Sequence, residues 1–184
     1  MVSAETEKKF MDHIAEFGLS FATSEEYNFR LQQFQKHDDI YNEINSNKLN
    51  TFTVGHNQFS TWTDYEYGRL LGEKNVKQYS TSGKFVSQKW SDATSIDWRA
   101  LGKVSPIQNQ GMCGSCWAFA ASAAMESSYM INANLSEAKL AEQQFVDCDT
   151  QCSGCNGGLG RLAFEYAETT PVAHETDYPY AAAD

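Results

Sequence analysis

QGMCGSCWAF, the stretch from Gln110 to Phe119, places Cys116 directly before a long run of small residues with helical character. A thiol at the N-terminus of a helix faces unpaired backbone N–H groups and the positive end of the helix dipole, and both favour the thiolate. A thiolate is the nucleophile that acyl transfer to cysteine requires. The stretch therefore predicts a reactive cysteine with a side-chain amide, Gln110, six residues upstream.

The composition indicates an acidic globular protein. Hydrophobic residues make up 41% and aromatic residues 13% of the 184 residues, enough for one ordinary domain or two small ones. A net charge of −10 and a pI near 4.8 argue against nucleic acid and against an anionic membrane as partners. No apolar run approaches the length of a membrane span, and the first ten residues lack the apolar core of a signal peptide. We expect any targeting segment to lie outside this chain.

Charge is divided unevenly along the chain. Residues 1–91 carry ten basic and twelve acidic side chains, a balance of −2, whereas residues 92–184 carry four and twelve, a balance of −8. The sequence predicts two units with these boundaries, and the polar stretch 72–91 is the extended connector between them.

Hydrophobic spacing predicts helices in both units. An apolar face that includes Phe10 and Phe17 indicates an amphipathic helix ending at Gly18, and a capping box of Thr23 and Glu26 begins a longer helix that runs to about residue 45. A short strand is expected at 51–59 and a short helix at 62–71. Further helices are expected at 117–132, 137–147 and 161–168, the last after a glycine-rich loop.

The five cysteines all lie in the second unit, and their odd number suggests disulfides together with a reactive or unpaired thiol. Cys113 with Cys116, and Cys152 with Cys155, form two CxxC pairs that could hold zinc or act in redox chemistry. The 35 residues between the pairs have helical character and exceed the roughly 15–20 of common zinc ribbons. No βαβ pattern precedes Cys113, so both interpretations are disfavoured.

Five segments, in order along the chain, resemble the papain-like cysteine peptidases, and cathepsin L-like zymogens in particular. IDWRALGKVSPIQNQGMCGSCWAFA (96–120) resembles the mature N-terminus up to the nucleophile, and LAEQQFVDCD (140–149) and GCNGGL (154–159) match two later segments. Upstream, GHNQF (55–59) resembles the second propeptide motif. The spacing of the ERFNIN propeptide helix is found at Glu26, Arg30, Phe34 and Asn45.

The resemblance implies an α+β fold class that is mostly helical in this chain. Residues 1–91 would form a helical inhibitory propeptide, and residues 92–184 the helical first lobe of the catalytic domain, without the β-rich second lobe. It also implies protein and peptide substrates, the chain's own propeptide bound in the cleft and cystatin-like inhibitors as partners, with no cofactor, no metal, no nucleic acid and no membrane. The implied location is lysosomal, vacuolar or secreted.

Residue roles follow from the same resemblance. Cys116 would be the nucleophile, and the Gln110 amide together with the Cys116 backbone N–H would form the oxyanion hole. Gly157 and Gly158 would pair with the substrate backbone, since missing side chains let an extended peptide approach. Leu159 would form one wall of the pocket for the substrate's second residue, and the glycine that follows it would widen that wall.

The resemblance also assigns the remaining cysteines. Cys113 would pair with Cys155, and Cys148 would pair with a cysteine beyond residue 184. Cys152 does not belong to the family pattern, so it is either free or paired with Cys148. Independently, Asn134 begins an N-glycosylation sequon, Asn-Leu-Ser, which matters only in the secretory pathway.

The chain departs from the family pattern at its histidines. The histidine that activates such a cysteine lies ~130–150 residues downstream, with an asparagine beyond it. Only His174 follows Cys116, in a segment resembling the surface end of the first lobe. We expect the chain by itself to be inactive, because it lacks this histidine and asparagine. His13, His37 and His56 lie in the propeptide-like unit and are no better candidates.

Two propeptide motifs are also altered. His37 and Tyr41 stand where Asn and Ile are usual in the helix, and Thr61 stands where the second motif has aspartate. A helix-surface role for His37 is the simpler interpretation, and acid sensing is the alternative.

The function expected from the sequence is thus a cysteine endopeptidase zymogen that acid activates. Protonation would weaken contacts between a lysine-bearing propeptide and an acidic enzyme unit, with cleavage within about residues 78–93. One alternative is a propeptide-like inhibitor that acts on other cysteine peptidases through residues 1–91. An inhibitor, however, needs neither QGMCGSCWAF nor the substrate-binding segment GCNGGL (154–159). Another is a degenerate peptidase that only binds peptides.

Overall fold

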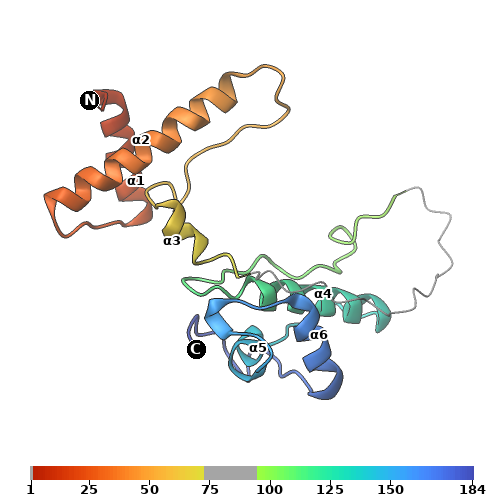
Figure 1. Ribbon diagram of the computed structural model, residues 1–184. Helices are drawn as coiled ribbons and strands as arrows, with labels where there is room; N and C mark the ends of the chain where they lie inside the picture. The colour runs from red at the N-terminus through yellow and green to blue at the C-terminus, as the bar shows by residue number, and fades with distance from the viewer. Residues whose placement is uncertain (1, 73–94) are drawn as a thin grey trace. The chain divides into compact units, whose positions relative to one another are not determined.

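The computed structural model describes residues 2–72 and 95–184, which divide into two compact units, Met1–Gly68 and Arg69–Asp184 (Figure 1). The first unit contains α1, α2 and α3, and the second contains α4, a short α5, a 3-10 turn η1 (Gly154–Asn156) and α6. The predicted connector lies outside the described residues from residue 73 onward. Residues 69–72 are part of the second compact unit.

Two capped helices form the body of the first unit. α1 (Ala4–Phe17) begins earlier than its apolar face suggested, because Ser3 accepts a hydrogen bond from the backbone of Thr6 at 3.0 Å. It ends at Gly18 as predicted, where a φ of 60° suits glycine. α2 (Ser24–Ser46) starts at the predicted cap, with the Thr23 hydroxyl accepting from the Glu26 backbone at 3.1 Å.

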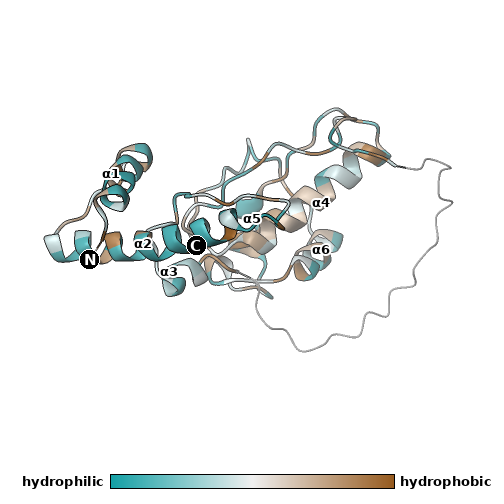
Figure 2. Ribbon diagram, turned by 90° about the horizontal axis from the view of Figure 1, so that it is seen from above, coloured by the Kyte–Doolittle hydropathy of each residue, from teal (hydrophilic) through white to brown (hydrophobic). Residues whose placement is uncertain are grey.

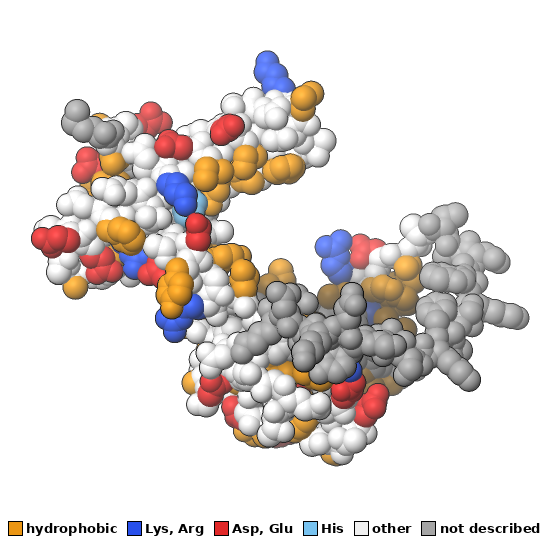
Figure 3. Space-filling model, in the orientation of Figure 1, with side chains coloured by type: hydrophobic (Ala, Val, Ile, Leu, Met, Phe, Trp, Pro, Cys, Tyr) orange, Lys and Arg blue, Asp and Glu red, His pale blue; other side chains and the backbone are white. Residues whose placement is uncertain are grey.

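Aromatic side chains fill the space between α1 and α2. Phe10, Leu31 and Phe34 are buried, and the ring of Phe10 lies 5.2 Å from that of Tyr27 and 5.4 Å from that of Phe34. These contacts account for the stability of two otherwise polar helices, since most helical stability in proteins comes from packing of an apolar face. Figure 3 shows further hydrophobic side chains along α2 and the loop after it, where Ile40, Leu49 and Phe52 remain exposed.

A polar cluster is embedded in this aromatic core. Asp38 is 6% exposed and accepts hydrogen bonds from Lys9 and pairs with His56, each at 3.1 Å. The ring of His13 is 3% exposed and lies 6.0 Å from that of His56. Neither His13 Nε2 nor His56 Nδ1 has a hydrogen-bond partner among the described residues. Two imidazoles therefore share an apolar site with one carboxylate.

The strand predicted at 51–59 is wrong: this segment is an irregular loop. Its backbone pairs with a side chain instead of a strand, since Asn45 Nδ2 donates to the Val54 carbonyl at 2.7 Å and Asn45 Oδ1 accepts from the Val54 amide at 2.8 Å. A side-chain amide can imitate a strand partner, so the alternating pattern did not require a sheet.

The helix predicted at 62–71 is shorter than expected, because α3 spans only Asp64–Gly68. Thr63 caps it by accepting from the Glu66 backbone at 3.1 Å. Both terminal nitrogens of the Arg30 guanidinium donate to the Glu66 carboxylate at 2.7 Å. These bonds, together with hydrogen bonds from Thr63, lower the pKa of Glu66 to about 2. The ion pair joins α3 to α2.

The second unit is organised around α4 (Cys116–Asn132), the most apolar helix in Figure 2. Trp117, Ala118 and Ala121 on α4 pack with Phe145 of α5 and Ala163 of α6 (Gly160–Thr169). The small side chains of α4 let both neighbouring helices approach closely. α4 and α6 follow the predicted ranges within one residue at each end.

α5 spans Glu142–Cys148, whereas we predicted a helix at 137–147. Residues 139–141 are extended, because Leu140 forms an isolated antiparallel bridge with His174 and the Ala141 amide donates to Ala173 O at 3.0 Å. Across residues 2–72 and 95–184 the structure contains helices and loops but no strand, which confirms the helical character expected of this part of the fold. Among these helices, none is both long and apolar enough to cross a membrane.

Lys139 connects two buried carboxylates beside α4 and α5. Its ammonium lies 3.3 Å from Glu126 Oε1 and closer still to Glu142, and these acids are 1% and 2% exposed. Burial alone would lower the pKa of Lys139, but the pairs with Glu142 and Glu126 outweigh burial and raise it. The more exposed Glu175 lies 3.8 Å away.

We predict that acid weakens the first unit through His13. Burial and the neighbouring His56 lower the pKa of His13 below its ordinary 6.5. The unfolded chain then binds a proton that the folded chain does not, so stability is full above about pH 6.5 and falls as the pH drops below it, by at most ~1.4 kcal/mol per pH unit. His13→Phe should flatten this dependence in urea unfolding followed by the NMR signals of α1 and α2.

The polar groups around His13 and His56 are Lys9, Asp38 and Asn42. Burial alone would raise the pKa of Asp38, but its contacts with His56 and Lys9 outweigh burial and lower it. Asp38 is therefore protonated only in stronger acid. Met11→His, on the exposed side of α1, is the matched control and should leave the slope unchanged. An unaltered slope in His13→Phe would contradict the prediction.

We also predict that Lys139→Met destabilises the second unit by about 3–5 kcal/mol at neutral pH, because it leaves two buried carboxylates unpaired. Glu175→Gln, which removes only the more exposed partner, should cost about 1 kcal/mol or less. Urea unfolding followed by circular dichroism compares the two; equal effects would mean that the buried cluster is not held by its lysine.

Candidate active site

The thiol of Cys116 lies at the first turn of α4, as its position in the sequence predicts. Ser115 precedes the helix, and its carbonyl accepts from the Ala118 amide at 2.9 Å. The half-buried Cys116 is a free thiol at the end where the N–H groups of a seventeen-residue helix remain unpaired. This is the end of a helix that carries the positive pole of the helix dipole.

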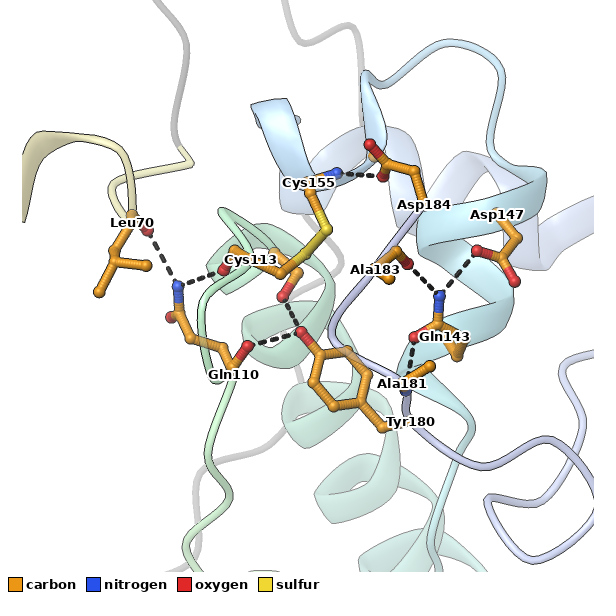
Figure 4. Close-up of a disulfide and its surroundings, with 12 residues drawn as sticks. Leu70, Gln110, Cys113, Gln143, Asp147, Cys155, Tyr180, Ala181, Ala183 and Asp184 are labelled. Atoms are coloured by element: carbon orange, nitrogen blue, oxygen red, sulfur yellow. Dashed lines mark hydrogen bonds between the residues drawn. A yellow bond between two sulfur atoms is a disulfide. The ribbon is translucent and has the colours of Figure 1, made fainter. Parts of the chain in front are cut away.

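A disulfide joins Cys113 to Cys155, the pairing that the family resemblance implies (Figure 4). Beside it, the Gly114 amide donates to the Cys155 carbonyl at 2.9 Å. The bond ties the loop before α4 to the glycine-rich loop before α6. Since it takes one cysteine from each CxxC pair, these four sulfurs are not arranged as a tetrahedral zinc site.

The side-chain amide of Gln110 points across the loop toward two backbone carbonyls (Figure 4). Gln110 Nε2 donates to Cys113 O at 2.8 Å and to Leu70 O at 2.9 Å. The first bond orients the amide within its own loop. The second shows that the amide can donate to a backbone carbonyl outside its own loop.

Residues 69–72 lie directly over the thiol. The Gly72 amide donates to Cys116 Sγ at 3.1 Å, and the Gly72 carbonyl accepts from the Gly158 amide at 2.7 Å. A Cβ on Gly72 would lie 2.1 Å from Gly114 O and 3.1 Å from the sulfur. Only glycine fits at this point, so backbone alone covers Cys116.

The two glycines predicted to pair with the substrate backbone, Gly157 and Gly158 (the glycine strip), contact the segment 69–72 at Gly72. A Cβ on Gly157 would lie 2.4 Å from Gly72 O, and one on Gly158 would lie 2.6 Å from the Trp117 ring and from Cys152 Sγ. Glycine at 157 thus leaves room for a neighbouring backbone, and glycine at 158 lets the strip pack on α4. Leu159 follows, half-buried, at the start of α6.

The other predicted residues lie elsewhere in the second unit. Cys148 is exposed and free, and Cys152 is half-buried and free, so the two do not pair with each other. Burial, with a contribution from Asp149, raises the pKa of the Cys152 thiol to about 11. Asn134 is exposed, with its side-chain oxygen 3.4 Å from Lys103 Nζ.

No imidazole of the second unit lies beside the thiol. His174 is exposed and its Nδ1 is bonded to the Thr176 hydroxyl at 2.9 Å, which matches the surface role expected for it. It is the only histidine after Cys116 in the sequence. Among the described residues, the site therefore combines a free thiol with a side-chain amide, and the one histidine of this unit lies elsewhere.

Two contributors were missed by sequence reasoning. Gly72 was assigned to the connector, although a glycine directly after a helical pattern is a signal of close backbone approach. Tyr180 was not singled out, because nothing in its local sequence distinguishes it from Tyr178. Its hydroxyl lies 2.6 Å from Ser115 Oγ and 2.8 Å from Gln110 O.

The chain matches two protein-family models and many known proteases. The family described as Papain family cysteine protease matches residues 93–184, and the Cathepsin propeptide inhibitor domain (I29) matches residues 10–67. The senescence-specific cysteine protease SAG12 of Arabidopsis thaliana is 36% identical over 189 residues, covering 97% of this chain and 54% of that protein. A cathepsin L-like proteinase of Phaedon cochleariae is 37% identical over 155 residues, covering 82% and 46%.

Solved structures agree with these matches. Digestive procathepsin L2 from the larval midgut of Tenebrio molitor superposes with a TM-score of 0.87 at 32% identity, covering 97% of this chain and 61% of that chain. A recombinant stem bromelain precursor gives a TM-score of 0.82 at 34% identity, covering 98% and 59%. The chain spans about half the length of the curated relatives it matches.

We predict that Gly72→Ala uncovers the thiol. Its methyl group cannot fit beside Gly114, so the hydrogen bonds to Cys116 and Gly158 are lost, at about 1–2 kcal/mol or a 5- to 30-fold change in the covered fraction. Alkylation of Cys116 by iodoacetamide should accelerate accordingly, with peptide mass spectrometry distinguishing it from Cys148 and Cys152. Gly68→Ala, where an added Cβ meets nothing within 4 Å, is the control. Equal rates in all three proteins would show that Gly72 does not shield the sulfur.

Proposed function

The chain belongs to the papain family of cysteine proteases and has a cathepsin propeptide inhibitor domain ahead of its protease part, and from this we propose that it acts as the latent form of a cysteine endopeptidase. In this proposal residues 1–91 are the inhibitory propeptide and residues 92–184 the first lobe of the catalytic domain. The observation that supports it most directly is the contact of residues 70–72 with Gln110, Cys116 and Gly158.

These three contacts are the ones a substrate backbone needs. The Gln110 amide donates to a carbonyl, the Gly158 amide donates to a second carbonyl, and the sulfur lies beside the chain between them. In the active enzyme the Cys116 thiolate attacks the scissile carbonyl, and the Gln110 amide with the Cys116 N–H stabilises the oxyanion. Collapse of this intermediate expels the amine, and water then hydrolyses the thioester.

Two proton transfers in this cycle require a group from outside the 184 residues. The departing amine must gain a proton, and the attacking water must lose one. His174 is exposed and bonded to Thr176, so it does not serve this purpose. We therefore propose that these 184 residues alone do not turn over substrate, and that a histidine oriented by an asparagine completes the site.

In this proposal the protein is latent because a backbone segment of its own chain takes the position of the substrate backbone. Residues 69–72 occupy the place of substrate at the thiol while offering no side chain beyond Cα at Gly72, and the remainder of the propeptide anchors them. Acid would release this cover by protonating carboxylates between the less acidic residues 1–91 and the strongly acidic residues 92–184, and by weakening the histidine-containing core of the first unit. Cleavage would follow within about residues 78–93.

Finer assignments belong to the same proposal. Leu159 and Gly160 line the pocket for the substrate's second residue, Asn134 accepts a glycan, and Cys148 pairs with a cysteine outside these residues. Its exposed, unpaired sulfur supports that last assignment. The enzyme would work in a lysosomal, vacuolar or extracellular compartment on protein and peptide substrates, and cystatin-like proteins would inhibit it.

The experiment uses the product of the complete coding sequence, incubated at about pH 4.5 and at neutral pH. We expect hydrolysis of a dipeptidyl fluorogenic amide after acid treatment, a new N-terminus within 78–93, and loss of all activity in Cys116→Ser. Gln110→Ala should lower kcat by about 10²–10³-fold. Absence of hydrolysis under every condition, combined with tight inhibition of other cysteine peptidases by residues 1–91, would favour a dedicated inhibitor instead.

A further inference from the structure

The two donors of the oxyanion hole come from different parts of the loop before α4. The Gln110 amide belongs to the first residue of the loop, and the Cys116 N–H belongs to the first residue of the helix. Between them lie Gly111, with a φ of 59°, and Gly114. A loop with two glycines does not by itself hold its ends at a fixed separation. The bond from Gln110 Nε2 to Cys113 O and the disulfide at Cys113 fix the middle of the loop, and a further contact spans its two ends.

The Tyr180 hydroxyl connects the two ends of this loop. It lies 2.8 Å from the Gln110 carbonyl and 2.6 Å from the Ser115 hydroxyl (Figure 4 shows the contact with Gln110). A carbonyl can only accept, so the single Tyr180 proton is donated to Gln110 and Ser115 donates its own proton to Tyr180. Burial raises the pKa of Tyr180, which keeps the phenol a donor at working pH.

Tyr180 is itself held rigidly. Its ring packs edge-to-face on Phe119, one turn into α4, with centroids 4.8 Å apart. The next residue, Ala181, donates to Gln143 Oε1 at 2.8 Å, and Gln143 Nε2 donates to Ala183 O at 2.7 Å. α5 thus fixes the segment that carries the phenol, as Figure 4 shows.

Ser115 transmits this position to the helix. It is fully buried, directly precedes Cys116, and its carbonyl accepts from the Ala118 and Phe119 amides. A shift of Ser115 would therefore move the first turn of α4 and the Cys116 N–H with it. On the other side, a shift of the Gln110 backbone would swing its side-chain amide.

We propose that Tyr180 is a positioning residue that sets the distance between the Gln110 amide and the Cys116 N–H, and so tunes the oxyanion hole. This inference rests on the proposed peptidase function. Tyr180 acts through Gln110 and Ser115, and among the described residues its hydroxyl bonds to neither the thiol nor the segment 69–72.

The test is Tyr180→Phe in the acid-activated product of the complete coding sequence. Phenylalanine keeps the ring contact with Phe119 and removes only the hydroxyl. Displacing donors should cost less than deleting one, so we expect kcat to fall by about 10-fold while KM stays within about twofold. The Ki of a peptide aldehyde, which forms an oxyanion on binding, should rise by a similar factor.

Two comparisons separate positioning from general damage. Iodoacetamide alkylates Cys116 by direct displacement and forms no oxyanion, so its rate should not change in Tyr180→Phe. Tyr178→Phe is the matched control, because its hydroxyl is bonded to Asp147 at 2.7 Å, away from the loop, and all its kinetic constants should equal those of the wild type.

Each other outcome overturns the inference. Unchanged kcat and aldehyde affinity in Tyr180→Phe, in a wild-type background that hydrolyses peptide, would refute the role of Tyr180 alone. A parallel fall in alkylation rate would show a merely structural role. A wild-type protein that hydrolyses nothing would overturn the peptidase function and this inference with it.

Discussion

The disulfide between Cys113 and Cys155 is the constraint on which the second unit depends. It fastens the loop that ends at Cys116 to the loop that begins the glycine strip, although these loops are separated by the whole of α4 and α5. The Gly114 amide and the Trp117 indole donate to carbonyls of the same loop, at Cys155 and Gly154. The disulfide therefore fixes the distance between Cys116 and the glycine strip more firmly than side-chain packing alone would.

Glycines at close backbone contacts are a second feature of this site. Gly114, Gly157 and Gly158 let three backbone segments meet within hydrogen-bond distance, and Gly72 completes the set from the covering segment. Each site would be blocked by a single methyl group. In the proposed peptidase the same arrangement would serve a bound substrate and an inhibitory segment, because both would present only backbone amides and carbonyls at the thiol. Latency and catalysis would then use one set of contacts.

Polar groups within the first unit determine how its stability responds to pH. Arg30 and Glu66 pair in a strong geometry that survives acid, since the pKa of Glu66 is about 2. His13 is buried among aromatic rings, and its Nε2 lacks a partner in the described residues. The ion pair holds the unit together at low pH, whereas protonation of His13, whose pKa is lowered by burial, opposes it there.

The sequence alone was sufficient for the main helices and for the position of the Cys116 thiol at a helix start. Caps at Thr23 and Gly18, and the small-residue run after Cys116, are local signals, and local physics was enough to interpret them. The strand at 51–59 was wrong because its partner is the distant side chain of Asn45, and α5 was too long because the residues before it pair with the segment at His174.

Only the tertiary structure decided which groups surround the thiol. Three residues, Gly72, Gly158 and Tyr180, are brought to Cys116 and its loop from three separate places along the chain. Spacing along a sequence specifies periodicity and turns, but contacts between distant segments depend on how helices pack and on which loops are bonded together. For that reason the sequence determined that a cysteine stands at the start of a long helix, and the fold determined which groups surround it.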